Sequence, residues 1–250
     1  MKKNAIIFIH HNTNEIAKHN LELIKKFNPD CDVFTVGFSW HSLFPDSHIV
    51  YRTEDWPVNY RLNNILNCGT SSESDLYIYD FFMHHQDYES YFVVEWDTYC
   101  NTSIQNFYGD AMKKYHTFSA FIFTNKPDLP DADKTKLKYV KEWSWFGYFD
   151  QLKSDSDKNK LIPYLGGTYP TSLLFYRNNV LHDMMTILLN NPRLYDNIQN
   201  EMRLGTLIQS AGYELIEHGG ETNQFFEQPH YKEYISKQIK GYYHPIKEIL

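Results

Sequence analysis

The sequence predicts an α/β fold with a mostly parallel central sheet flanked by helices, and three observations predict it. Residues 5–9 (AIIFI) form an unbroken apolar run, as in a strand buried on both faces. Residues 16–27 then carry apolar side chains at helical spacing, and residues 32–37 (DVFTVG) form a second strand-like run. Because a β-α-β unit places its two strands side by side and parallel, this start predicts a Rossmann-like sheet.

The remaining elements follow from apolar runs and turn residues. Asn12 or Thr13 is suited to cap the first helix, and Asn28-Pro29-Asp30 to end it. Further strands are expected at residues 75–82 (DLYIYDFF), 90–94 (SYFVV), 119–124 (SAFIFT), 172–176 (SLLFY) and 213–217 (YELIE). Helices are expected at residues 59–66, 178–189 and 200–211, the last of which ends at Gly212.

Length, charge and cysteine content limit the possible functions. The 250 residues suffice for one large domain with a sizeable core. A net charge of −7 argues against a nucleic-acid partner, and no apolar run is long enough for a transmembrane helix. The N-terminus is typical of a first strand and not of a signal peptide, and the three cysteines show no zinc-site spacing. We therefore expect a cytoplasmic protein, and its oligomeric state is left open.

The segment YFVVEWDT, residues 91–98, places two carboxylates directly after a buried strand. In open α/β sheets, ligands bind beyond the carboxyl ends of the strands, so Glu95 and Asp97 would face that crevice. Their hard oxygens suit Mg²⁺ or Mn²⁺ held together with a substrate diphosphate. Two solvated acids after a strand, or an N-cap at Asp97, would give the same pattern, so both interpretations stay open.

At these residues the chain resembles nucleotide-sugar glycosyltransferases of the GT-A fold. Their strand ends in Asp-x-Asp, and here Glu95 stands in the place of the first acid. Three further stretches are similar to that family in the same order along the chain. They are YIYDFFMHHQDYESYFVVEWD around the acids, EMRLGTLIQSAGYEL downstream, and YYHPIKE near the end.

The resemblance implies a Rossmann-like GT-A sandwich that forms a single domain over residues 1–250. Its nucleotide-binding half would be about residues 1–100 and its acceptor-binding half about residues 101–250. It implies transfer of a sugar from a nucleotide-diphosphate sugar to a hydroxyl of a glycan or other acceptor, with Mn²⁺ or Mg²⁺ as cofactor. The implied metal ligands are Glu95, Asp97 and His244.

Other residues are assigned roles on the same basis. We expect contacts to the donor from His10, Asn12, Trp96 and Lys247, with Lys247 meeting its phosphates. Glu201 is the expected general base of an inverting transfer, because such a reaction needs a carboxylate at the acceptor hydroxyl. The reserve candidates for that role are Glu142 and Asp150, which flank an aromatic cluster suited to stacking on a sugar (Trp143, Trp145, Phe146 and Tyr148).

Plainer interpretations of these residues remain. His244 and Lys247 also fit a surface tail, Glu201 a solvated helix face, and the aromatic cluster ordinary core packing. Gly166-Gly167-Thr168 is expected as a turn, or as a backbone stretch that approaches the donor sugar. His84 and His85 argue little for a metal site, because neighbouring residues on a strand point to opposite faces.

Two other functional classes stay open. One is a non-catalytic sugar- or nucleotide-binding protein on the same fold. The other is a metal-dependent nucleotidyltransferase or phosphodiesterase, which also uses clustered carboxylates. The sequence has no G-x-S-x-G, and no G-x-G-x-x-G follows the first strand, which argues against an α/β-hydrolase and against ordinary NAD binding.

Overall fold

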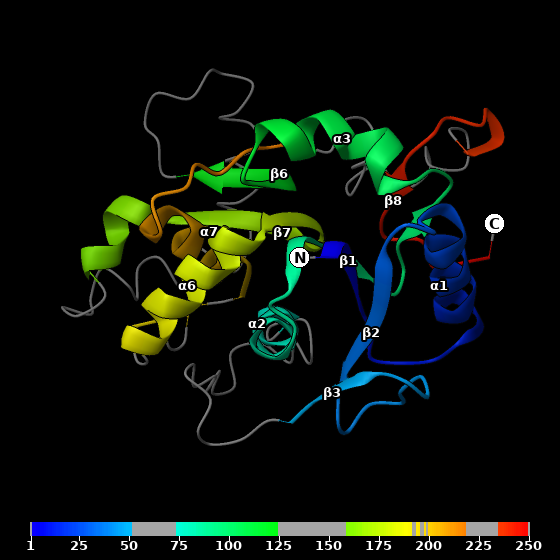
Figure 1. Ribbon diagram of the computed structural model, residues 1–250, viewed down its shortest axis with the longest axis horizontal. Coiled ribbons are helices and arrows are strands. Elements are labelled where there is room, and N and C mark those ends of the chain that lie inside the picture. Colours follow the sequence, from blue (N-terminus) through cyan, green and yellow to red (C-terminus); the bar gives the residue numbers. More distant parts are fainter. Residues whose placement is uncertain are drawn as a thin grey trace.

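The structure is a computed structural model that describes residues 2–51, 74–124, 159–191, 194, 195, 198, 200–218 and 235–249. Its described part is built on a six-stranded sheet in the order β3-β2-β1-β4-β7-β6 (Figure 1). The strands are β1 (Lys2–Ile9), β2 (Asp32–Phe38), β3 (His48–Val50), β4 (Tyr88–Glu95), β6 (Thr117–Thr124) and β7 (Gly166–Arg177). Strands β3, β2, β1 and β4 are parallel, and β7 is antiparallel to both β4 and β6. The predicted α/β class with a mostly parallel sheet is confirmed.

Helices cover both faces of the sheet (Figure 1). They are α1 (Glu15–Phe27), α2 (Ser74–His84), α3 (Ile104–Lys114), α6 (Asn178–Asn190) and α7 (Asn200–Ser210), with a 3₁₀ turn η2 (Asn159–Tyr164). Strand β1 separates two cores because its successive side chains point to opposite faces. Ala5, Ile7 and Ile9 join the core under α2, α6 and α7, whereas Ile6 and Phe8 join the core under α1 and α3. None of the helices described here is long and apolar enough to span a membrane.

Most of the predicted elements are found, with small shifts at their ends. The cap of the first helix is Asn14 and not Asn12 or Thr13, because the Asn14 side chain accepts a hydrogen bond from the Ala17 N–H at 2.8 Å. Helix α7 ends near Gly212, which adopts a φ of +84° that favours glycine. Strand β3 and helix α3 were not predicted. The helix expected at 59–66 lies outside the described residues.

Residues 75–82 form most of helix α2, so the strand prediction there is wrong. Every residue from Ser74 to Phe82 is buried in this helix. A helix buried all round shows no amphipathic period, so its sequence looks like a buried strand. Asp75 has its charge compensated within the core, because Arg203 of α7 donates two hydrogen bonds to it, each 2.6 Å long.

The strand expected at residues 213–217 is also absent. The chain there makes only an isolated bridge, in which Glu217 lies beside Ser119 of β6. The Ser119 N–H donates to Ile216 O at 2.9 Å, and the His218 N–H donates to Ser119 O at 2.8 Å. The β6–β7 register shifts between Ser119 and Phe121, and this irregularity in β6 accompanies the single bridge.

The C-terminal segment is tied to the end of β4. Strand β8 (Tyr242–Tyr243) pairs antiparallel with β5 (Tyr99–Cys100), and the Ile246 N–H donates to Asp97 O at 2.8 Å. Tyr242 and Ile246 are buried. In Figure 1, β8 and the C-terminus lie on the same side of the sheet as α1. Residues close to the end of the chain are therefore held beside the segment 95–100.

Candidate metal and donor site

The structure brings Glu95, Asp97 and His244 together. His244 Nε2 lies 2.9 Å from Glu95 Oε2 and 3.0 Å from Asp97 Oδ1. The possible ligand atoms of the three side chains all lie within 4.8 Å of one another. His244 is buried, so the alternative that it belongs to a solvated surface tail is excluded. Whether the three bind a metal stays a prediction.

The local backbone explains why these side chains meet. Glu95 is the last residue of β4, at the carboxyl edge of the parallel strands, and its carbonyl accepts from the Thr98 N–H at 2.9 Å to close a turn. Asn20 of α1 donates to Trp96 O at 3.1 Å. The β5–β8 pairing then brings His244 alongside. The turn is thus fixed by the sheet, by a helix and by the C-terminal segment.

Burial and charge act in opposite directions at this cluster. Burial alone would raise the pKa of Asp97, but His244 and Lys247 outweigh it and hold the pKa of that carboxyl well below its usual range. Burial alone would lower the pKa of His244, but Asp97 and Glu95 outweigh it and raise the pKa to about 10. At neutral pH the cluster without a metal therefore holds an ionised Asp97 beside a protonated His244.

The donor set fits a hard or borderline divalent cation. Two carboxylates and one imidazole match the ligands of Mn²⁺, and carboxylates match those of Mg²⁺. Asp97 Oδ1 is buried and is held by its ion pair with His244. A bound cation would supply at this atom the positive charge that His244 supplies in its absence.

Lys247 and Trp96 border the cluster. The Lys247 ammonium forms an ion pair with Asp97 and lies 4.4 Å from the centre of the Trp96 ring. Its side chain is 59% exposed, so the ammonium can reach a ligand in solvent. His11 packs edge-on against Trp96 at 5.1 Å, and burial lowers its pKa even though Asp97 and Glu95 are near. No role was predicted for His11 from the sequence. The only sign that it lies near this site was its position next to His10, directly after β1.

His10 and Asn12 lie at the carboxyl end of β1 in different surroundings. His10 is fully buried, with Nε2 3.0 Å from Ser47 Oγ and its ring 4.8 Å from that of Phe44. Burial lowers its pKa to about 4, so it is neutral at physiological pH. Asn12 is half-buried and accepts from the Asn14 N–H at 3.2 Å. Donor contacts by either residue stay predictions.

Glu201 lies buried in the first turn of α7. This helix is anchored to α2 by Arg203 and by a hydrogen bond from Asn200 to Ser74. It packs against the start of β7, where Thr206 Oγ1 donates to Gly166 O at 3.4 Å. Because β7 runs antiparallel, its start lies at the same sheet edge as the end of β4. The predicted base thus lies on a helix bordering that edge, and its role stays a prediction.

Gly166-Gly167-Thr168 is not a turn, because these residues begin β7 and pair with Thr124, Phe123 and Ile122 of β6. Helix α7 packs closely against this start of β7, because a Cβ on Gly205 would lie 2.5 Å from Gly167 N and a Cβ on Gly166 would lie 2.4 Å from the Gln209 side chain. Glu142, Asp150 and the aromatic cluster at residues 143–148 lie outside the described residues.

Comparison with known proteins gives likenesses in structure only. No protein-family model matches the chain, and no curated protein matches it. The galactosyltransferase LgtC in complex with donor and acceptor sugar analogues shares 10% identity and a TM-score of 0.41, over 92% of this chain and 78% of that one. An active-site mutant of LgtC shares 9% identity and a TM-score of 0.40, over 87% and 74% of the chains.

A third solved structure is the bifunctional glycosyltransferase WbbM without ligand. It shares 10% identity and a TM-score of 0.43 over 99% of this chain, which spans 46% of the WbbM chain. At these identities the likeness to the three structures concerns the fold alone.

Proposed function

We propose that the protein is a metal-dependent glycosyltransferase that moves a sugar from a nucleotide-diphosphate sugar to a hydroxyl of a glycan or other acceptor. The observation that carries the proposal is the meeting of Glu95, Asp97 and His244 at the carboxyl edge of the sheet, with Lys247 beside them. This edge is where open α/β sheets bind their ligands. A cationic side chain next to a metal-ligand set suits a diphosphate.

Glu95, Asp97 and His244 would hold Mn²⁺ or Mg²⁺. When bound, the cation supplies positive charge that binds the donor diphosphate and stabilises the charge developing on the leaving nucleoside diphosphate. Asp97 is the principal anionic ligand, because its carboxyl is ionised and nearly excluded from solvent. His244 would bind the cation as the neutral imidazole, which requires it to give up its proton.

Lys247 would contact the donor phosphates. Its ammonium is held near Asp97 and over Trp96, and it would be free to turn toward a second anion if Asp97 held a cation. Trp96 and Asn12 offer an aromatic face and an amide near the same edge, which suit the nucleoside. His10 would have a supporting role, because it is buried and its hydrogen bond to Ser47 holds the segment before β3 in place.

We propose Glu201 as the general base of an inverting transfer. A base must take the proton of the acceptor hydroxyl as the sugar carbon is attacked. The support is its position in the first turn of a helix that is fixed to α2 and borders the carboxyl edge. A carboxylate held on a packed helix keeps one geometry, as such a base requires.

A second candidate is a non-catalytic nucleotide- or sugar-binding protein. The observation that favours it is that His244 and Lys247 already neutralise Asp97 with no metal. Such a protein would bind its ligand equally well with and without a divalent cation.

One experiment separates the two candidates. The chain is freed of metal with a chelator and incubated with a panel of nucleotide sugars, with and without Mn²⁺, while released nucleoside diphosphate is measured. The transferase predicts release that needs Mn²⁺ and is lost in Asp97→Asn but not in Asp110→Asn, a change at a fully exposed acid. Metal-independent binding without release would support the second candidate.

A further inference from the structure

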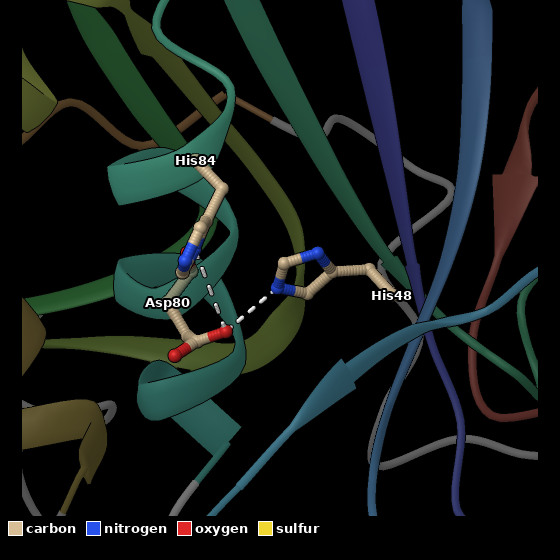
Figure 2. A group of neighbouring side chains, drawn as sticks. All are labelled: His48, Asp80 and His84. Atoms are coloured by element: carbon tan, nitrogen blue, oxygen red, sulfur yellow. Dashed lines mark hydrogen bonds and ion pairs between the residues drawn. The ribbon is translucent and has the colours of Figure 1, made fainter.

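Helix α2 and edge strand β3 carry a second cluster of metal-ligand side chains, which shares no residue with the first. His48 of β3 points toward Asp80 of α2, and His84 lies one turn further along the helix (Figure 2). We propose that His48, Asp80 and His84 form a Zn²⁺ site that fastens β3 to α2. The inference is independent of the proposed glycosyltransferase function.

The distances suit a small ion. His48 Nε2 lies 2.6 Å from Asp80 Oδ2, and His84 Nδ1 lies 3.9 Å from the same oxygen. One ligand atom from each of the three residues lies within 4.8 Å of the others. Ligands at about 2.0–2.2 Å from a tetrahedral ion are about 3.3–3.6 Å apart, so small side-chain adjustments bring the three atoms to that spacing.

The helix explains why the cluster forms. Residues four apart lie on the same face of a helix, so Asp80 and His84 present a two-ligand pair to one side. His84 and His85 diverge here as they would on a strand, and the partner that the helix gives His84 is Asp80, four residues before it. The third ligand comes from another element, because His48 begins β3 and pairs there with Val36 of β2.

The cluster is both held and accessible. Asp80 and His48 are largely buried, at 13% and 16% exposed, and the His48 ring packs edge-on against Phe81 at 5.5 Å. His84 is 60% exposed, which gives an ion a route from solvent. His84 Nδ1 now donates to Asp80 O at 2.8 Å, and a bound ion would replace that hydrogen bond.

The ligand types favour Zn²⁺ over the cation proposed for the first site. Two imidazoles and one carboxylate form a set that Zn²⁺ binds with four-coordinate geometry, and water takes the remaining position. Mg²⁺ and Mn²⁺ prefer sites richer in oxygen, like the Glu95 cluster with its two carboxylates. The two clusters should therefore differ in metal preference.

A bound ion would stabilise the packing of β3 against α2. Strand β3 is three residues long, and among the strands that the structure describes it lies at the sheet edge and pairs with β2. Zn²⁺ bound to His48 and to two residues of α2 would add a link that the native state has and the unfolded state lacks. Ligand binding of this kind stabilises the native state.

The test uses the full chain after metal removal, titrated with Zn²⁺ alone and followed by calorimetry and thermal denaturation. We expect His84→Ala and Asp80→Asn to weaken one class of Zn²⁺ sites at least tenfold and to lose the corresponding rise in Tm. The matched control is His182→Ala, which removes an exposed histidine 3.5 Å from Asp183 and should leave binding unchanged. His84→Ala should retain the metal-free Tm, because the side chain is mostly exposed.

Two results would overturn the proposal. One is Zn²⁺ binding by His84→Ala and Asp80→Asn that equals that of the unchanged chain. The other is complete loss of Zn²⁺ binding in Asp97→Asn, which would place all the zinc at the first cluster. Mn²⁺-dependent release of nucleoside diphosphate, measured on the same variants, tests the proposed function separately and should be unaffected by His84→Ala.

Discussion

His10 gives the fold a pH dependence whose size can be worked out. Burial lowers the pKa of its imidazole from 6.5 to about 4, and the nearby His41 and His11 add to the lowering. In the unfolded chain the imidazole takes up a proton near its ordinary pKa, so between the two values the unfolded state binds more protons. The stabilisation is therefore complete above about pH 6.5 and is lost as pH falls toward about 4.

The magnitude follows from the same shift. At about 1.4 kcal/mol per pKa unit, the whole contribution is at most about 3.4 kcal/mol. More than half of this contribution to the free energy of unfolding can be measured at ordinary pH values, because the loss between about pH 7 and about pH 5 comes to about 2 kcal/mol. The variant His10→Gln keeps a polar side chain able to bond Ser47 but removes the titration.

Urea denaturation at both pH values measures the prediction. The unchanged chain should lose about 2 kcal/mol more than His10→Gln on going from about pH 7 to about pH 5. Packing costs of the substitution cancel, since only each chain's change with pH is compared. His182→Gln, at an exposed histidine, should lose as much as the unchanged chain. An equal loss in His10→Gln would show that His10 is not held neutral by burial.

Three further predictions concern the site and its support. Asp97→Asn should lower transfer by orders of magnitude and weaken Mn²⁺ binding measured by calorimetry, with a smaller effect for Glu95→Gln; normal activity in Asp97→Asn would refute the metal assignment. Glu201→Gln should lower transfer by about a hundredfold to ten-thousandfold at unchanged donor affinity, and the product anomer read by NMR should be inverted; a retained product would remove the need for this base. Gly205→Ala should lower the free energy of unfolding in urea by about 1–3 kcal/mol, because its Cβ would meet the backbone of β7, whereas Gly109→Ala, which meets only the flexible Gln105 side chain, should be tolerated.

Strong local patterns explain which parts of the fold could be predicted. Residues 5–9 form a continuous apolar run and residues 32–37 a strand-like run on either side of an amphipathic helix, and a parallel β-α-β unit fits them. Helix α2 was misread because burial on every side removes the period that identifies a helix. Strand β3 has three residues, too few for any period to show.

The two side-chain clusters differ in how far the sequence reveals them. Glu95 and Asp97 were identified because a short motif follows a buried strand, and His244 because the order of motifs resembled a known family. His48 and Asp80 gave no such signal, since their proximity depends on how β3 packs beside α2. Reading residues 75–82 as a strand also hid the spacing of four that pairs Asp80 with His84.

The packing of the C-terminal segment against the end of β4 determines at what stage of folding the site can form. Glu95 and His244 are 149 residues apart in the chain. Closing a flexible loop of that length costs at least about 4.5 kcal/mol of chain entropy, which contacts among three side chains do not offset before the sheet between them has formed. We therefore expect the ligand cluster to form late in folding. An ion that binds there selects molecules whose two chain regions have already docked, and its occupancy reports completion of the fold.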